Sequence, residues 1–336
     1  MKIEAKRELV LGTDMKAVKV TKAGPVTEVV QFRNVPKDTG MRKLNADQYI
    51  NLNTGEVGDI KHIENRAGDL KSIRATLRTI RMIVNANVLE AQKATWLTLT
   101  YADNMTDTEK LYIDFKAFWL RFGRYCKKQG WNVPKYISVV EPQGRGAWHM
   151  HIFLLWDMKA PFIDNNSVME KLWDHGWTKT KAVKDVDNIG AYFSAYLADI
   201  PLEEAEKLPA DELHLMQQNE RELKSFEDEH GFLKEKKFIK GGRLYLYPRG
   251  MCIIRHSRDI LQPSVEWTNQ EAWEERRIKE KSQLGALTFS SSISVSDDDG
   301  TLLNLITKEY YNANRTDDVK LNGKDYENGK QENLVE

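Results

Sequence analysis

Alternating apolar and polar positions predict strands in the middle of the chain. Residues 96–101 read Trp-Leu-Thr-Leu-Thr-Tyr, rich in β-branched and aromatic side chains, which is typical of a strand. Residues 135–141 and 148–156 have the same character, and the turn between them contains Gly144 and Gly146. Because so short a link joins antiparallel neighbours, we expect these two segments to form a β-hairpin. Further strands are predicted at 177–184, 243–247 and 251–256.

Apolar residues at steps of three to four positions predict amphipathic helices in two longer segments. The first covers 64–93, and the second covers about 106–130. In the second, Thr106 followed by Glu109 is a capping-box signature, and Gly130 marks the end. Shorter helices are predicted at 166–175 and from Asp187, and residues 202–230 have a charged, helical pattern.

The order β, α, β-hairpin, α, β, α predicts an α+β domain with a central antiparallel sheet of about five strands and helices packed on it. We expect this domain to cover 86–262, with a helical insertion at about 202–240. Residues 1–85 are expected to form an N-terminal arm and a basic helix. The polar composition after residue 263 predicts an acidic tail, 263–336, that is partly disordered.

Composition adds limits on the class of protein. The chain has 336 residues, of which 41% are hydrophobic and 30% charged, which excludes collagen-like and low-complexity chains and disulfide scaffolds. No apolar run approaches the roughly 20 residues that span a bilayer, so no membrane partner is expected. The first residues lack the apolar core of a signal peptide. With only two cysteines, we expect a reduced, cytoplasmic protein.

Charge is distributed unevenly although the formal net charge is zero. Residues 1–95 contain 17 Lys and Arg against 11 Asp and Glu, whereas residues 285–336 contain 5 against 10. A basic front and an acidic tail fit a protein that contacts a polyanion with one part. An ordinary uneven surface explains the same counts, so charge alone does not choose between these interpretations.

A candidate metal site lies on the predicted hairpin. His149 and His151 are two positions apart on one strand, so both imidazoles point to the same face. Glu141 ends the preceding strand and comes opposite the pair if the register places it on that face. Two imidazoles and a carboxylate suit Mg²⁺, Mn²⁺ or another octahedral divalent ion. Two unrelated histidines on a surface strand are the alternative interpretation.

A candidate pair of nucleophiles lies on the predicted helix after Asp187. Tyr192 and Tyr196 are four positions apart, which puts both phenols on one helix face. Tyrosine is a poor nucleophile by itself because its pKa is about 10, but a metal ion can make a phosphate ester more electrophilic. Two tyrosines would permit consecutive cutting and joining steps on DNA. Ordinary packing of a tyrosine pair is the alternative.

Three segments in this order resemble the HUH endonuclease superfamily, specifically the rolling-circle replication initiators (Rep proteins) of small phages and plasmids. They are residues 97–101, Glu141 together with residues 148–153, and residues 188–197. The lead-in at 173–177 and the later segments Arg243–Tyr245 and Ser257–Arg258 are also similar to this group, so the resemblance covers roughly 90–260. Here the histidines precede the tyrosines, as in replication initiators, whereas conjugative relaxases usually have the tyrosine first.

The resemblance implies a metal-dependent DNA endonuclease and strand transferase. Glu141, His149 and His151 would hold one Mg²⁺ or Mn²⁺ ion, and Tyr192 would attack single-stranded or hairpin origin DNA. The products would be a 5′-phosphotyrosine and a 3′-hydroxyl that primes rolling-circle replication, with Tyr196 as the candidate second nucleophile. Origin DNA, a host helicase and a host polymerase are the implied partners.

One departure concerns the helix that carries the tyrosines. The family pattern normally has a lysine three residues after each tyrosine, but here the positions hold Ala195 and Asp199. Basic residues elsewhere are therefore expected to contact DNA phosphates. Candidates on the strand before the tyrosines are Lys179, Lys181 and Lys184, and candidates elsewhere are Arg145, Arg243, Arg255 and Arg258.

Three alternatives stay open on the sequence. A relaxase or transposase of the same superfamily would use the same chemistry. A DNA-binding regulator that keeps the fold without cutting is suggested by Ala195 and Asp199. A zinc hydrolase fits less well, because the sequence has no HExxH helix and no fourth ligand at a suitable spacing.

Overall fold

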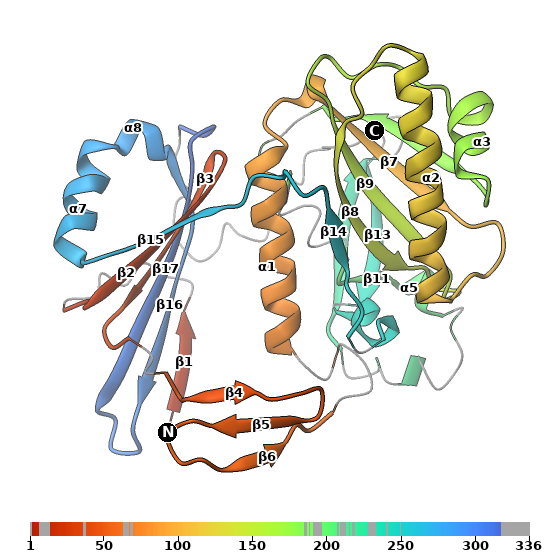
Figure 1. The fold of residues 1–336 in the computed structure, drawn as a ribbon. Coiled ribbons are helices and arrows are strands. Elements are labelled where there is room, and N and C mark those ends of the chain that lie inside the picture. Colours follow the sequence, from red (N-terminus) through yellow and green to blue (C-terminus); the bar gives the residue numbers. More distant parts are fainter. Residues whose placement is uncertain are drawn as a thin grey trace. The chain divides into compact units, whose positions relative to one another are not determined.

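The computed structural model describes most of the chain, which divides into two compact units (Figure 1). Unit 1 consists of residues 1–64 and 263–329, and unit 2 consists of residues 65–262 and 330–336. The described residues are 2–6, 14–35, 38–62, 67, 70–184, 187, 189–190, 197–206, 208, 213–214, 216, 219–227, 233–239, 241–248 and 250–316. Among them, no helix is long and apolar enough to cross a bilayer.

Unit 2 is built on a five-stranded sheet in which every neighbouring pair is antiparallel. The strand order is β10-β7-β9-β8-β14. The strands are β7 (Ala94–Thr100), β8 (Lys135–Pro142), β9 (Trp148–Leu155), β10 (Thr178–Ala182) and β14 (Ile254–His256). The predicted α+β class, the central antiparallel sheet and the hairpin of β8 and β9 are therefore confirmed.

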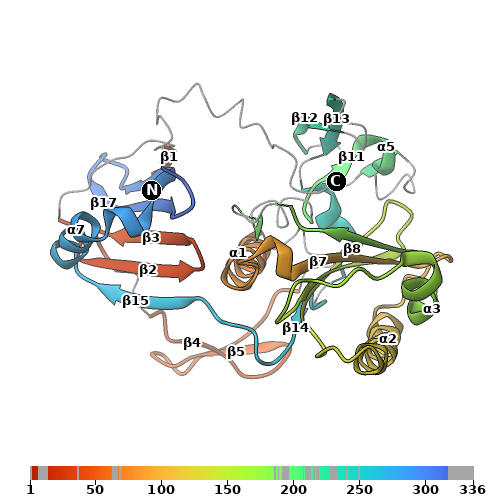
Figure 2. The same ribbon diagram turned by 90° about the horizontal axis from the view of Figure 1, so that it is seen from above.

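Two long helices cover this sheet, α1 (Leu70–Asn87) on one face and α2 (Thr108–Lys128) on the other (Figure 2). The apolar stripe of α2 is buried in the core, including Phe118 and Phe122. The cap of α2 is one residue later than predicted, because the Asp107 carboxylate, and not Thr106, accepts hydrogen bonds from the first turn. Gly130 ends the helix with a positive φ of 77°, as the sequence predicts.

The segment between the hairpin and β10 forms a short π-helix, η3 (Asn165–Met169), continued by α3 (Glu170–Trp173). The predicted helix ends there and not at Gly176, because Asp174 adopts the left-handed conformation with φ 64°. A short 3₁₀ turn, η2 (Ala91–Lys93), precedes β7.

The predicted helical insertion at 202–240 is wrong for most of the described residues. Helix α5 (Leu202–Ala205) is a single turn, and a second, three-stranded antiparallel sheet occupies most of the rest. Its strands are β11 (Ile200–Pro201), β12 (Arg221–Glu227) and β13 (Leu233–Ile239). The strand predicted at 243–247 is instead a 3₁₀ helix, η4 (Gly242–Leu246). The many charged residues of β12 and β13 give these strands the composition of a solvated helix, which explains the wrong prediction.

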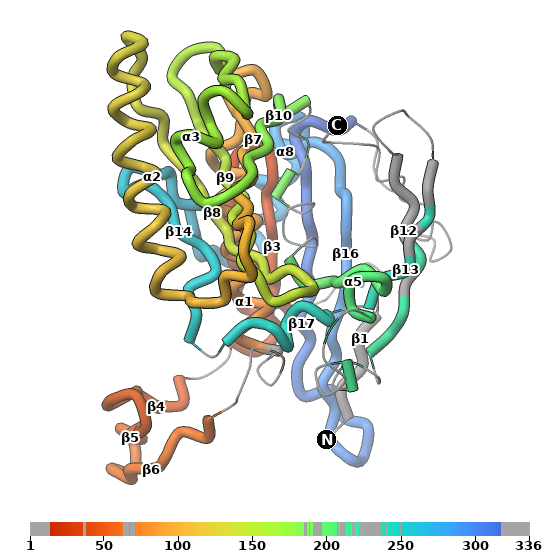
Figure 3. Tube along the Cα trace, turned by 90° about the vertical axis from the view of Figure 1, so that its right-hand side faces the viewer, coloured from red at the N-terminus to blue at the C-terminus, as the bar shows by residue number. Residues whose placement is uncertain are grey.

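Unit 1 contains a six-stranded sheet in the order β1-β16-β17-β3-β2-β15, in which β16 and β17 form a long antiparallel pair (Figure 3). The strands are β1 (Lys2–Lys6), β2 (Ala17–Ala23), β3 (Val26–Phe32), β15 (Ser264–Thr268), β16 (Ala286–Ser296) and β17 (Leu302–Asn312). The helices are α7 (Gln270–Lys279) and α8 (Lys281–Leu284), and Trp273 of α7 is buried in this unit's core.

Unit 1 also contains a small three-stranded sheet of β4 (Met41–Lys43), β5 (Gln48–Asn51) and β6 (Val57–Asp59). The expectation of an arm at 1–85 and a partly disordered tail from 263 therefore differs from the structure for the described residues. Both ends of the chain contribute strands to one sheet, because β17 pairs with β3 and β15 pairs with β2. Helix α1, assigned to the arm on sequence, belongs to unit 2.

Candidate functional site

The register of the hairpin brings the three predicted metal ligands to one face of the five-stranded sheet. Glu141 on β8 is directly opposite His149 on β9, and directly opposite residues share a face. His151 lies two positions further along β9 and therefore points the same way. The sequence left this register open, and the pairing resolves it in favour of a common site.

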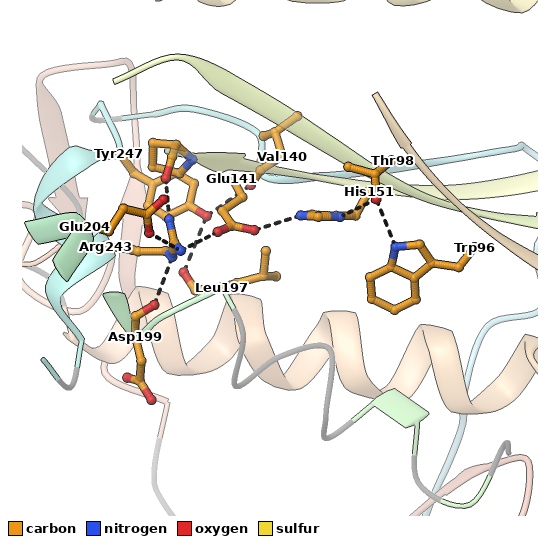
Figure 4. A network of polar contacts seen from close by, with 11 residues as sticks. Trp96, Thr98, Val140, Glu141, His151, Leu197, Asp199, Glu204, Arg243 and Tyr247 are labelled. Atoms are coloured by element: carbon orange, nitrogen blue, oxygen red, sulfur yellow. Dashed lines mark hydrogen bonds and ion pairs between the residues drawn. The ribbon is translucent and has the colours of Figure 1, made fainter. Parts of the chain in front are cut away.

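A chain of polar contacts orients His151 (Figure 4). Its Nε2 lies 2.7 Å from Glu141 Oε2, and its Nδ1 lies 3.2 Å from the Thr98 hydroxyl. That hydroxyl accepts a hydrogen bond from Trp96 Nε1 at 3.1 Å, so its own proton is available to Nδ1. The network therefore favours the tautomer in which Nε2–H donates to Glu141.

His149 presents a different environment. Its Nε2 is buried and has no hydrogen-bond partner among the described residues, and its ring centroid lies 6.2 Å from that of His151. Burial, with a further contribution from His151, lowers the pKa of His149 to about 4. The imidazole is therefore neutral at physiological pH, which is the form that binds metal ions.

Glu141 is an ionised carboxylate in the protein interior, with only 2% of its surface exposed. Burial by itself would raise the pKa of Glu141, but the Arg243 guanidinium and the hydrogen bond from His151 outweigh burial and lower it. Arg243 Nη2 lies 2.7 Å from Glu141 Oε1. The two carboxylate oxygens thus face two different partners.

Arg243 was predicted to contact phosphates, but in the structure it faces the protein interior and is only 3% exposed. Besides Glu141, its guanidinium contacts Glu204, the Pro142 carbonyl and the Asp199 carbonyl. Sequence reasoning missed this role because Arg243 follows Glu141 by about a hundred positions and no periodic pattern links the two.

The donor set fits a divalent cation in type and in direction. His149 supplies a buried nitrogen without a partner among the described residues, His151 is backed by the Thr98 hydroxyl, and Glu141 is ionised. Thr98 can also accept a proton from Nδ1 when Nε2 binds a metal, as partners of histidine ligands do. In the present arrangement, no cluster of three metal-binding side chains is found in the described part of the chain.

Two of the predicted basic residues lie on the same face as the histidines. Lys179 is directly opposite Thr98, and Lys181 is directly opposite Trp96, on the edge strand β10. Thr98 contacts His151, so the face that carries the histidines continues onto β10 with two cations. Lys184 follows this strand and is exposed.

The remaining predicted cations do not gather at this face. Arg255 is opposite Ser138, so it alternates to the other face of the sheet, where its guanidinium lies 3.4 Å from the ring centroid of Tyr112. Arg258 follows β14 at the end where β8 begins, away from Glu141. Arg145 lies in the hairpin turn and donates to the Tyr101 carbonyl at 2.8 Å.

The predicted nucleophiles, Tyr192 and Tyr196, lie outside the described residues, as does Ala195. The residues on either side of them are described. Ile189 and Leu197 are both buried in the core of unit 2. Asp199, at the second position where the family pattern has a lysine, accepts a hydrogen bond from Gly241 N at 2.8 Å with its carboxylate.

Comparison with protein families adds one result. Residues 94–200 match a family model described as Replication-associated protein ORF2, which covers phage replication proteins. The matched segment begins with β7 and contains Glu141, both histidines and both tyrosines, while unit 1 lies outside it. A comparison with curated proteins finds no match. The similarity to this replication-associated family agrees with the resemblance to replication initiators stated from the motifs.

Proposed function

We propose that the protein initiates rolling-circle DNA replication by nicking single-stranded or hairpin origin DNA. The observation that carries the proposal is the pairing of Glu141 with His149 and His151 on one sheet face, with the His151–Glu141 contact at 2.7 Å. This cluster lies within the segment similar to the replication-associated family. Neither observation alone would distinguish a nickase from a structural histidine pair.

Glu141, His149 and His151 are the residues that would hold one Mg²⁺ or Mn²⁺ ion. When bound, such an ion would withdraw charge from a DNA phosphodiester and from the oxygen that leaves it. The protein's own contribution is the environment of the site. Glu141 is kept ionised by Arg243, and His149 is kept neutral by burial, so both donors are in their ligand form at neutral pH.

In the proposed reaction the phenol oxygen of Tyr192 attacks the phosphorus and the bond from phosphorus to the 3′ oxygen breaks. The phenol proton goes to solvent or a nearby base, and the leaving 3′ oxygen takes up a proton to become a hydroxyl. The downstream strand is then joined to the protein as a 5′-phosphotyrosine, and the upstream 3′-hydroxyl primes synthesis. Tyr196 is the proposed nucleophile of the second, terminating transfer.

Lys179 and Lys181 are proposed to replace the lysines that the family pattern has after each tyrosine. Both extend from the β10 end of the sheet on the face of the histidines, where they would attract the phosphate backbone. Substituting each of them by alanine should slow nicking, whereas Lys128→Ala in the last turn of α2 is the matched control. Unchanged nicking by both alanine variants would contradict this role.

A non-cutting DNA-binding regulator is the second candidate. It is favoured by Asp199, whose carboxylate accepts a hydrogen bond from a backbone amide and supplies no positive charge. A relaxase or transposase would share the cutting chemistry and would differ in whether the freed 3′-hydroxyl primes replication.

The decisive experiment is a covalent-adduct assay with the full chain. Single-stranded oligonucleotides that tile the DNA around the gene, labelled at the 3′ end, are incubated with Mn²⁺ and separated under denaturing conditions. We expect a labelled protein–DNA adduct from the wild type, none from Tyr192→Phe, and none after chelation by EDTA. Tyr49→Phe in unit 1 is the matched control and should form the adduct normally.

Two outcomes separate the candidates. If every oligonucleotide binds but none forms an adduct with Mn²⁺ or Mg²⁺, the regulator is favoured and the nickase proposal fails. If Tyr196→Phe abolishes the adduct and Tyr192→Phe does not, the order of the two nucleophiles is the reverse of that proposed.

A further inference from the structure

The segment that carries both tyrosines is held by described residues at its two ends. At the N-terminal end, Gly190 N donates to Asn85 Oδ1 of α1 at 2.9 Å. Gly190 lies so close to α1 that a Cβ atom there would clash with the Arg81 carbonyl oxygen. Ile189 is fully buried in the core of unit 2. This end of the segment is therefore anchored on α1.

At the C-terminal end, Tyr247 links the segment to the strand that carries Glu141. Its hydroxyl lies 3.0 Å from the Val140 carbonyl and 3.4 Å from the Leu197 carbonyl. Val140 precedes Glu141 on β8, and Leu197 directly follows Tyr196 in the chain. Tyr247 is fully buried, so water does not compete for these contacts.

Arg243 makes the same connection with more bonds. Its backbone N–H donates to the Ala198 carbonyl at 3.0 Å, and its Nε donates to the Asp199 carbonyl at 2.8 Å. Its Nη1 donates to the Pro142 carbonyl at 2.6 Å, and its Nη2 pairs with the Glu141 carboxylate. A planar guanidinium fixes the directions of these bonds relative to one another.

We propose that Arg243 and Tyr247 are positioning residues that set where the tyrosine segment lies relative to Glu141. The bonds reach chain positions one to three residues after Tyr196 and the end of β8 at the same time. The proposal rests on the proposed nicking function for its consequence, because attack requires the reacting atoms to approach within about 3–3.5 Å. It adds two residues from outside the matched segment 94–200.

The arrangement is more specific than a generally buried arginine. The donors come from η4 and the residue after it, and the two sets of acceptors come from the ends of two functional segments. Loss of these bonds should therefore alter the catalytic rate more than the affinity for DNA. The neighbouring Tyr245 lacks this arrangement, because its hydroxyl donates to Asn219 Oδ1 at 3.2 Å.

The test compares Tyr247→Phe and Arg243→Lys with the matched control Tyr245→Phe in the full chain. Single-turnover adduct formation is measured at saturating 3′-labelled oligonucleotide, and the Kd for the same oligonucleotide is measured by fluorescence anisotropy. We expect the rate to fall roughly tenfold for Tyr247→Phe and about 100-fold for Arg243→Lys, since small displacements have effects of this size. The Kd of both variants should stay within about twofold of wild type, and Tyr245→Phe should match wild type in both quantities.

Hydrogen exchange provides a readout that does not depend on cleavage. In DNA-free protein, peptides covering 189–201 should exchange faster in Tyr247→Phe and Arg243→Lys than in wild type or Tyr245→Phe, while peptides from α2 should not change. Faster exchange together with no adduct from wild type would overturn the proposed function and leave the structural link between the two segments standing. Unchanged exchange in both variants, or a loss of rate fully explained by a weaker Kd, would overturn the positioning role.

Discussion

The two large sheets of this protein each bury a glutamate, but in different electrostatic surroundings. Glu141 in unit 2 pairs with Arg243 and accepts from His151, and these contacts lower its pKa despite full burial. Glu309 in unit 1 accepts a hydrogen bond from Tyr311 at 2.8 Å, but burial dominates and raises its pKa. A buried carboxylate stays charged when a cation is fixed beside it, and a neutral hydrogen bond is not sufficient.

The same contrast holds for uncharged polar groups. In unit 2, Trp96, Thr98, His151 and Glu141 form a continuous chain of contacts. In unit 1, four buried side-chain atoms have no hydrogen-bond partner among the described residues: Gln31 Oε1, Trp273 Nε1, Ser290 Oγ and Thr307 Oγ1. Connected polar groups fix orientation and charge, and this is the difference expected between a site and a scaffold.

The largest expected effect is that of removing the charge of Glu141. Glu141→Gln leaves Arg243 with Glu204 as its remaining carboxylate partner and should lower the free energy of unfolding by about 3 kcal/mol, as for other broken buried ion pairs. Guanidinium unfolding, with hydrogen exchange to locate the affected strands, measures this change. A loss below about 0.5 kcal/mol would show that the ion pair contributes little.

Acidification should weaken unit 2. His149 has a pKa of about 4 in the folded protein and about 6.5 when exposed, so the unfolded state takes up the proton first as the pH falls. The stabilisation is complete above pH 6.5 and is lost progressively toward pH 4, by at most about 3 kcal/mol. The lowered pKa of Glu141 acts in the same direction at more acidic pH.

Glu309 should make the opposite contribution in unit 1. Its raised pKa means that its contribution to stability is complete below the unfolded pKa and is lost as the pH rises through the folded pKa. Hydrogen exchange of the chelator-treated full chain between about pH 7 and pH 4 should therefore show protection falling first in β8 and β9. Earlier loss of protection in β16 and β17 would contradict the comparison.

The two fully buried tryptophans provide a smaller test. Trp173 Nε1 donates to the Thr100 carbonyl at 3.0 Å, whereas Trp273 Nε1 has no partner among the described residues. Trp173→Phe should therefore destabilise the protein by about 1 kcal/mol more than Trp273→Phe, the value of one net hydrogen bond. Chemical unfolding of the two variants side by side checks the difference, and equal losses would argue against it.

The smallest expected effect is a gain. Glu309→Gln keeps an oxygen that can accept from Tyr311 and removes a charge that is unfavourable in the interior, so unfolding at about pH 7 should require on the order of 1 kcal/mol more. Thermal unfolding at neutral and at acidic pH tests the sign, because the gain should shrink as the pH falls. Destabilisation at neutral pH would mean that Glu309 has a stabilising ionic role.

Sequence patterns predicted the centre of unit 2 well and the edges of the chain poorly. The hairpin of β8 and β9 and helix α2 depend on local periodicity and short turns, so their residues can be recognised from neighbours alone. Strand β16 is rich in serine, and β17 mixes lysine and glutamate with apolar residues. Their composition suggested disorder, because the partners that make them strands lie near the other end of the chain.

The sequence by itself determined the candidate chemistry: the two histidines share a face because strand side chains alternate, and a short turn brings Glu141 back beside them. Only the tertiary structure decided the register that pairs Glu141 with His149, and the burial that keeps His149 neutral. It alone revealed Arg243 as the partner of Glu141. These features depend on contacts between distant positions and on exclusion of water, and neither leaves a periodic trace in a sequence.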